Sequence, residues 1–473
     1  MRMPKTPPDT DKTLDLLGTE KANNIIQVLL SHVQGPLVDG RYLHWEQLRR
    51  RGHPAGIKPE DWWFGLKVYR RGSSKHVPLL DKTGAKFSYV LVDPIHEGLH
   101  HIDQEAAGRI QMPEQVTSEE VKDRYYVNSL IEEATTSSLL EGATSTRPVA
   151  KEMIRTGRPP QDRSERMILN NYRTMQSIGT LKKERLSRKL VFEIHKLITE
   201  GTLDDPGAAG RFRRDGEERA VMSYEGEIYH VPPPVEQLEE RLEMMCAFAN
   251  ADMPGFIHPA VRSIILHFWL AYDHPFVDGN GRTARALFYW SMLRHGYWLF
   301  EFISISNVLL KAPSKYGLAF LYTETDDNDL TYFILHQIGV MSQAIRELHQ
   351  YLERKSRELR ELEMRIHGIT RFNVRQRALL SNALRKPRQV YTFQSHQTSW
   401  NVVYQTARSD LLHLCKSGLL EMGKAGRAFE FMPARGLERK LMEIGGQVAS
   451  PHGSARDGDD GAGRDEGGGN VGL

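Results

Sequence analysis

Apolar residues recur every three or four positions over long stretches of the chain, which predicts a mainly helical protein. The clearest case is a helix expected over 258–272, where Val261, Ile264, Ile265 and Phe268 would line one buried face. The same spacing predicts further helices over 117–142, 164–200, 235–250, 282–296, 342–370, 374–385 and 402–416. Helical elements therefore make up most of the expected fold.

Residues 117–142 carry the signals of both ends of a helix. Thr117 can cap the N-terminus, with Glu120 three positions later completing a capping box. Gly142 suits the position just past the C-terminus. This segment is therefore expected to form one long helix.

Two segments have the alternating pattern of strands. The first is "KFSYVLVD" (86–93). The second, "AVMSYEGEIYHVPPP" (220–234), alternates on both sides of Glu225-Gly226, which signals a hairpin that the three prolines end. We expect a small amount of β structure beside the helices.

Shifts in composition divide the chain into six parts. Residues 1–13 and 446–473 are rich in turn-forming and polar residues and are expected to be disordered tails. Between them we expect an α+β accessory domain at 14–115, a helical core at 116–341, a linker helix at 342–370 and a last domain at 371–445. The accessory domain contains Trp45, Trp62 and Trp63.

The last domain, 371–445, is basic, with thirteen Lys and Arg residues against five Asp and Glu. Its expected order is a helix, an irregular middle, a helix over 402–416 and two short strands around a glycine-rich turn. This order is typical of a winged helix. The helix over 402–416 would be its recognition helix, with Gln405, Thr406 and Arg408 on the outer face.

Composition limits the class of protein and its surroundings. The chain has 473 residues, is 40% hydrophobic, and has a net charge of only +3, so it is not a polycation that coats nucleic acid. Two cysteines cannot form a disulfide framework, which fits a reducing cytosol. No stretch has the length of a secretion signal or a membrane span. We expect a cytoplasmic protein with no membrane partner.

The chemistry concentrates in one polar segment between two apolar helices, "HPFVDGNGRTAR" (274–285). Gly279, Asn280 and Gly281 favour a turn whose backbone N–H groups point at one spot, which is an anion site, above all for phosphate. Arg282 and Arg285 follow at helical spacing and can add guanidinium groups to it.

The two residues at the start of this segment add a metal ligand and a base. Asp278 can hold Mg²⁺ that bridges phosphate oxygens. His274 ends the preceding helix and titrates near neutral pH, so it suits a general base. Together the segment has what is needed to transfer part of a nucleotide to a hydroxyl group.

Each of these features also has an ordinary structural explanation. A Gly-Asn-Gly sequence is usually a turn, a histidine at a helix end is usually a capping or packed residue, and two arginines at this spacing usually face solvent. Zinc is a further alternative, because His267 and His274 lie two helical turns apart. Pro275 disrupts that helix, however, and no third ligand is evident.

Taken together, residues 274–285 resemble the motif of the Fic/Doc family, His-x-Phe-x-Asp/Glu-Gly-Asn-Gly-Arg-x-x-Arg, at all eight defined positions. Fic proteins have segments similar to "EEATTSSLLEG" (132–142), "GRFR" (210–213) and "YHVPPP" (229–234) in corresponding places. The resemblance covers about 117–340. It implies a helical Fic core with a β-hairpin flap, and accessory and winged-helix modules of the kind that flank it in multidomain relatives.

The resemblance implies a protein adenylyltransferase that moves AMP from ATP to a Ser, Thr or Tyr hydroxyl. His274 would be the base, Asp278 would bind Mg²⁺, and Gly279, Asn280 and Gly281 would hold the phosphates. Arg282 and Arg285 would contact the outer phosphates. Doc-type relatives have lysine where this chain has Gly281 and act as kinases, so glycine favours AMP transfer.

The resemblance also implies regulation. Residues 137–142 fit the family's inhibitory motif, in which Glu141, after Ser137, pairs with Arg285 and competes with ATP. Without the resemblance, Ser-x-x-x-Glu is a common pattern at a solvated helix end. Tyr316 stands where relatives have the first of two tyrosines beside the nucleotide, but Gly317 replaces the second.

Several partners follow from the same resemblance. The hairpin would be a flap that pairs with an extended target segment, or else a plain surface hairpin. The chain could modify itself, form a homodimer, and bind DNA through the winged helix. Two alternatives stay open: a DNA-binding regulator whose Fic core senses a nucleotide, and an enzyme that uses another phosphate-linked donor.

Overall fold

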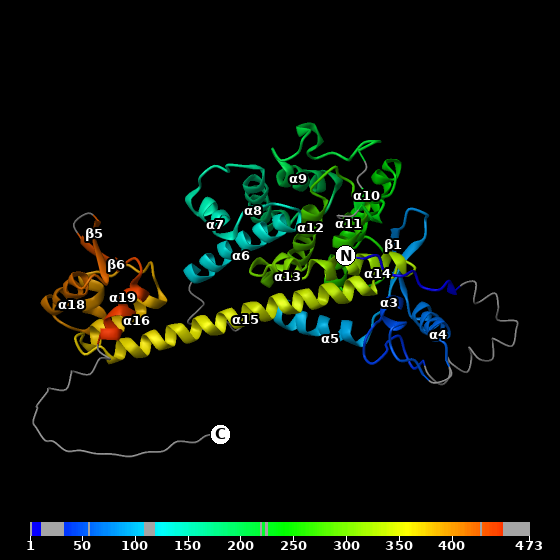
Figure 1. The fold of residues 1–473 in the computed structure, drawn as a ribbon. Helices are drawn as coiled ribbons and strands as arrows, with labels where there is room; N and C mark the ends of the chain where they lie inside the picture. Colours follow the sequence, from blue (N-terminus) through cyan, green and yellow to red (C-terminus); the bar gives the residue numbers. More distant parts are fainter. Residues whose placement is uncertain are drawn as a thin grey trace, which may run out of the picture. The chain divides into compact units, whose positions relative to one another are not determined.

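The computed structural model describes residues 2–10, 33–54, 57–107, 119–217, 220–222, 226–425 and 428–447. The fold is mainly helical, with three small antiparallel hairpins, as the sequence predicts (Figure 1). Thr117, Glu225, residues 1 and 11–13 of the first expected tail and residues 448–473 of the second lie outside the described residues. Within the described part of the chain, no helix has the length and apolarity that crossing a membrane requires.

The chain forms two compact units, and the boundary between them falls after Glu353, inside a single long helix, α15. That helix runs from Thr331 to Gly368, so it begins eleven residues before the expected linker helix. The buried side chains of Phe333, Met341 and Leu348 explain the earlier start, because they continue its apolar face into the core of the first unit.

Among the N-terminal elements of the first unit, the first two helices and the residues before them share a buried cluster that contains Trp45, Trp62 and Trp63. The elements are α3 (Trp45–Leu48), α4 (Pro59–Gly72), β1 (Lys75–Leu80), β2 (Lys86–Tyr89), α5 (Asp93–Ile102) and a π-helical turn, η1 (Asp103–Ala107). The strand expected over 86–93 ends at Tyr89, because Asp93-Pro94 begins α5.

Buried charges join these elements to the turn between α14 (Pro313–Thr325) and α15. The Lys67 ammonium lies 2.8 Å from an Asp326 carboxylate oxygen, and both side chains are almost fully buried. Tyr42 donates a hydrogen bond to Asp329 at 2.5 Å. Removing one partner of a buried ion pair strongly destabilises a protein, because the other charge stays buried without compensation. These contacts therefore hold the N-terminal residues on the rest of the first unit.

The rest of the first unit is a helical bundle centred on α11 and α12, which pack on each other, with α12 also contacting α8 and α9 (Figure 1). Its helices are α6 (Glu119–Leu140), α7 (Arg147–Thr156), α8 (Arg163–Leu181), α9 (Arg188–Thr199), α10 (Leu238–Ala249), α11 (Pro259–Asp273), α12 (Asn280–Arg294), α13 (Ile305–Lys311) and α14. Short 3₁₀ turns lie at Pro206–Ala208 (η3), Val235–Gln237 (η4) and Trp298–Glu301 (η5).

Two boundaries in this bundle differ from the sequence expectation. The pattern over 164–200 is two helices, α8 and α9, and Ser187 caps the second through its side chain. Helix α12 begins at Asn280, two residues before the expected Arg282, because Gly279 adopts a left-handed φ of 83° and serves as N-cap. The hairpin expected over 220–234 forms two short strands, β3 (Val221–Met222) and β4 (Ile228–His230).

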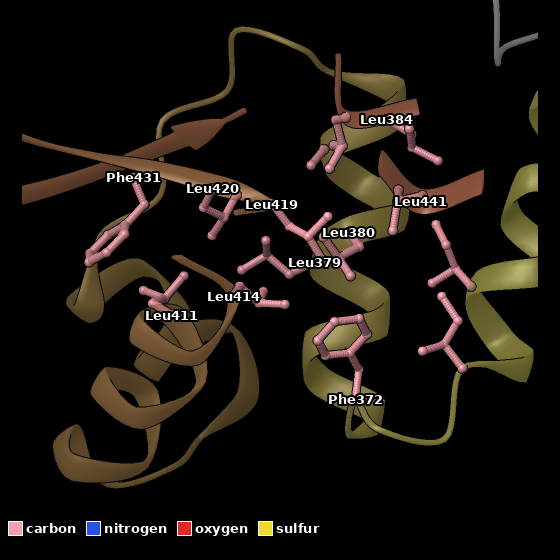
Figure 2. Close-up of a cluster of buried hydrophobic side chains, with 14 of the residues drawn as sticks. Phe372, Leu379, Leu380, Leu384, Leu411, Leu414, Leu419, Leu420, Phe431 and Leu441 are labelled. Carbon is pink, nitrogen blue, oxygen red and sulfur yellow. The ribbon is translucent and has the colours of Figure 1, made fainter. Parts of the chain in front are cut away.

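The second unit has a hydrophobic core of its own, shown in Figure 2. Its elements are α16 (Val374–Arg385), α17 (Phe393–Trp400), α18 (Tyr404–Lys416), β5 (Leu420–Ala425), β6 (Ala428–Pro433) and α19 (Leu437–Gln447). The expected irregular middle therefore contains a short helix, α17. Leu379, Leu411, Leu420 and Phe431 bring α16, α18 and the hairpin to one centre (Figure 2).

A buried carboxylate organises the helices of the second unit. Asp410 of α18 accepts hydrogen bonds from Arg375 at 2.7 Å and Asn373 at 2.6 Å, both at the start of α16. It also lies 3.2 Å from His396 of α17. These hydrogen bonds lower the pKa of Asp410 against the effect of burial. One charged side chain thus joins three helices.

Candidate active site

The loop between α11 and α12 begins with His274, which ends α11 in a left-handed conformation with a φ of 44°. Its main chain is held by Arg213, a fully buried side chain. The Arg213 Nε donates to the His274 carbonyl oxygen at 2.9 Å, and the Arg213 N–H donates to the Pro275 carbonyl oxygen at 2.9 Å. Arg213 belongs to the segment 210–213 that resembles Fic proteins, but the sequence alone predicts no role for its side chain.

Asn280 braces the loop from within. Its side-chain amide donates to the Phe276 carbonyl oxygen at 2.8 Å, and its carbonyl oxygen accepts from the Phe276 N–H at 2.9 Å. These two bonds join the loop to the first turn of α12. Asparagine therefore both favours the turn and holds the main chain of Phe276 through its side chain. Phe276 is fully buried, as its apolar ring predicts.

His195 of α9 supports the loop from the other side. Its ring stacks on Phe276 with 3.7 Å between ring centres. The Gly210 N–H donates to Nδ1 at 3.0 Å, so the proton is on Nε2, which donates to the Asp278 carbonyl oxygen at 2.9 Å. Burial lowers the pKa of His195 to about 4. No sequence signal marks this residue, because its role depends on a contact with Asp278, 83 positions away.

The residues predicted to form a phosphate nest lie at the start of α12. Gly279 has no room for a side chain, because a Cβ there would lie 2.7 Å from Thr199 Cγ2. The N–H groups of the first helical residues, Asn280, Gly281 and Arg282, have no acceptor within the helix and are oriented to bind an anion. In the structure, the Glu141 carboxylate lies at this nest: a Cβ on Gly281 would be 2.0 Å from Glu141 Oε1.

The two motif arginines are buried and have different partners. Arg285 donates to Ser137 Oγ at 2.8 Å, to the Ser137 carbonyl oxygen at 3.0 Å and to Glu141 Oε1 at 2.8 Å. Arg282 donates to the Ile198 carbonyl oxygen at 3.3 Å, but its Nε and Nη2 are buried without a hydrogen-bond acceptor among the described residues. Arg282 therefore retains donors for an anionic ligand.

Asp278 lies at the mouth of the nest, with 39% of its side chain exposed. Arg163 Nη2 is 3.4 Å from one of its oxygens, and Arg282 Nη2 is 3.7 Å from the same oxygen. The described residues contain no cluster of three or more His, Cys, Asp or Glu that could hold a metal by themselves. A single exposed carboxylate fits Mg²⁺, which usually takes one or two carboxylates and completes its shell with substrate phosphates and water.

The His274 side chain is partly exposed beside this nest. Burial, and then the nearby His230, lower its pKa to about 4, so the ring is neutral at pH 7. Its Nδ1 lies 3.4 Å from the Ala271 carbonyl oxygen. A neutral ring with its Nδ1 proton directed at that carbonyl has a lone pair on Nε2 for accepting a proton.

Tyr316 of α14 reaches the same region. Its hydroxyl oxygen is 2.8 Å from His267 Nε2. Burial raises the pKa of Tyr316 to about 12, against the opposing effect of Arg285. His267 is therefore engaged by a tyrosine, and the described residues supply no ligand set for the zinc alternative.

The structure thus brings most of the predicted site residues to one place. Burial lowers the pKa of Arg282 and the Arg285 guanidinium adds to this effect, while the carboxylates of Asp278 and Glu141 oppose it. The Glu141 carboxylate also opposes the lowering of the His274 pKa by burial. The site combines a neutral histidine, the N–H groups at the start of α12, two buried arginines and a partly exposed carboxylate. Such a group can bind a polyphosphate and accept a proton beside it.

Residues 185–292, which contain this loop, match the Fic/DOC family. The chain therefore contains a Fic/DOC family region. A protein adenylyltransferase Fic from Nematostella vectensis is 28% identical over 167 residues, which are 34% of this chain and 37% of that protein. One from Drosophila grimshawi is 26% identical over 163 residues, 33% of this chain and 32% of that protein. The similarity thus spans about a third of the length of these distant homologues.

Solved structures of Fic proteins are also similar. A Fic family protein from Desulfovibrio desulfuricans G20 superimposes with a TM-score of 0.49 at 16% identity, covering 73% of this chain and 97% of that one. Residues 134–508 of Fic-1 from C. elegans give a TM-score of 0.40 at 20% identity, covering 55% of this chain and 71% of that one.

Proposed function

We propose that this chain is an autoinhibited protein adenylyltransferase that transfers AMP from ATP to a Ser, Thr or Tyr hydroxyl. The observation that carries the proposal is the buried Arg282, whose Nε and Nη2 have no hydrogen-bond acceptor among the described residues, at the start of α12 and beside a neutral His274. The family match and the distant homologues named protein adenylyltransferase support the same chemistry.

In the proposed reaction, His274 accepts the proton of the target hydroxyl as its oxygen attacks the α-phosphorus of ATP. The new bond joins that oxygen to phosphorus, and the bond between the α-phosphorus and its bridging oxygen breaks, so that pyrophosphate leaves. The nest at Gly279, Asn280 and Gly281 and the Arg282 guanidinium hold the phosphate charge in place. Mg²⁺ held by Asp278 would neutralise phosphate charge as it builds up.

Glu141 would inhibit this reaction by occupying the place of phosphate. Its carboxylate accepts from Arg285 at 2.8 Å and lies against Gly281, where it takes up the donors that an outer phosphate needs. Ser137 holds the same arginine through its hydroxyl and carbonyl oxygens. In this structure the proposed inhibitor, Glu141, is in place, and activation would require its carboxylate to move away from Arg285 and Gly281.

The hairpin β3–β4 would receive the target segment. Val221, Met222 and Ile228 expose apolar side chains on these short strands. His230, at the end of β4, lies 2.7 Å from the Tyr272 carbonyl oxygen, two residues before His274. An extended peptide that paired with this hairpin would be held close to the base.

The position of the label on ATP tests the reaction. The Glu141→Gly variant should become labelled with ATP carrying isotope at the α-phosphate, with Mg²⁺ present, and should not be labelled from the γ-phosphate. Label from the γ-phosphate would mean a kinase instead. Binding of ATP with no label from either position would favour a nucleotide-sensing regulator or another phosphate-linked donor.

For the second unit we propose a winged helix that binds DNA through α18. The observation that favours it is the exposed face of α18, where Tyr404, Gln405 and Arg408 are open to solvent, in a region with an excess of positive charge. The full chain should retard a random duplex, and retardation should weaken as salt rises, since phosphate contacts release counterions. An Arg408→Glu variant that binds equally well, or no binding at low salt, would exclude this role.

A further inference from the structure

Glu133 is a buried carboxylate in α6, two helical turns before Glu141. Only 2% of the residue is exposed, and it forms no ion pair within the described part of the chain. A buried charge without a cation is costly unless hydrogen-bond donors surround it. Its presence in this helix therefore needs an explanation beyond packing.

Four donors surround this carboxylate. Oε2 accepts from Tyr289 Oη at 2.8 Å, from Ser304 Oγ at 2.8 Å and from the Ser306 N–H at 3.1 Å. Oε1 accepts from Ser306 Oγ at 2.5 Å. The donors come from α12, from the residue that caps α13, and from α13 itself. Four directional bonds to groups outside α6 define both its rotation and its position along its axis.

The contacts of α6 and the residue after it with α12 recur every four residues, and the residue numbers rise along α6 while they fall along α12. Glu133 meets Tyr289, Ser137 meets Arg285, and Glu141 lies over Gly281. Residues four apart lie on one face of a helix, so these three pairs form a ladder between antiparallel helices. A shift of α6 by one residue would rotate Glu133 by about 100° and move it by about 1.5 Å along the axis, which would break all four of its bonds.

We propose that Glu133 is a positioning residue that sets the register of α6 on α12, so that Glu141 reaches Gly281 and Arg285. It acts through α6, whose C-terminal end leads directly into Glu141. The inference that this register controls catalysis rests on the proposed function. The inference that Glu133 holds α6 in place does not.

Hydrogen exchange of the full chain tests the anchor without reference to activity. Glu133→Ala should speed amide exchange in peptides that cover residues 125–142, because the helix loses four bonds to its surroundings, while exchange in α8 and α9 stays unchanged. Glu133→Gln keeps the shape but cannot satisfy the Ser306 N–H and hydroxyl donors equally, and should lie between. The matched control is Glu132→Ala, since the neighbouring Glu132 forms a partly exposed ion pair with Arg147 of α7 at 3.0 Å, and an exposed pair contributes little to stability. Unchanged exchange in both Glu133 variants would overturn the proposal.

The link to catalysis is tested by combining substitutions. Glu133→Ala should raise α-phosphate labelling at least 5-fold over the wild type and should add nothing in a chain that already carries Glu141→Gly. An additive increase in the double variant would show that Glu133 acts elsewhere and would contradict a register role. If Glu141→Gly is itself inactive, the proposed function fails, and the exchange result still decides whether Glu133 holds the helix. Tyr289→Phe, which removes one donor, serves if Glu133→Ala does not fold.

Discussion

Replacing Glu141 with glycine should raise AMP transfer by about 5- to 150-fold, the range of a coupling free energy of 1–3 kcal/mol. The reason is that the Glu141 carboxylate has two contacts at the proposed phosphate site: it accepts a hydrogen bond from Arg285 at 2.8 Å, and it fills the space next to Gly281. Without it, the nest and Arg285 become available to the β- and γ-phosphates. The measurement is the initial rate of self-labelling from ATP labelled at the α-phosphate, compared with the wild type.

Two further variants separate charge from bulk. Glu141→Gln keeps the size but not the charge and should release less inhibition than glycine. The control is Glu132→Ala, which removes a glutamate earlier in α6 that pairs with Arg147. A rate for Glu141→Gly equal to that of the wild type, in a chain shown to bind ATP, would mean that Glu141 does not limit the reaction.

Removing the base should have the largest effect. In the Glu141→Gly background, His274→Ala should lower AMP transfer by about 10²- to 10⁴-fold, which is the usual contribution of a general base. ATP affinity should stay within a few-fold, because the nest and both arginines remain. The measurements are the labelling rate and the dissociation constant for ATP, taken on the same preparations.

The backbone at position 274 requires its own control. His274 has a left-handed φ of 44°, which alanine tolerates poorly. Asparagine adopts this conformation more readily, so His274→Asn keeps the loop and removes the base. Both variants should be equally inactive. An active His274→Asn chain would show that another group accepts the proton.

The local content of the site could be predicted from the sequence because it lies in twelve consecutive residues. The order of His274, Asp278 and the two glycines predicts a base, a metal ligand and a nest with no knowledge of tertiary structure. The pattern also predicted both arginines on one side of the first helical turn. The structure buries both of them. Only the tertiary contacts determine that Arg285 meets Ser137 and Glu141, while Arg282 Nε and Nη2 have no hydrogen-bond acceptor among the described residues.

The residues that support the site could not be predicted in this way. Arg213, His195 and Glu133 act through contacts with residues 61 to 173 positions away. Arg213 and Glu133 lie in segments that resemble the family, but no local pattern gives any of the three residues a role. A buried glutamate in a helix with alternating polar and apolar residues has the same sequence signature as a solvated one. Helix α15 was placed too late for a related reason, since its first two turns are apolar and resemble the end of a core helix.

The fit between Gly281 and Glu141 limits which substitutions this chain could accept at position 281. A side chain at position 281 would begin 2.0 Å from the Glu141 carboxylate, so even alanine would push the glutamate aside. In the Doc-type kinases a lysine occupies the corresponding position. If Glu141 is the inhibitor we propose, a substitution toward that chemistry would displace it at the first step, before any lysine could serve the new reaction. The missing side chain at position 281 would then have two uses, since it leaves room for a phosphate and also for the carboxylate that competes with it.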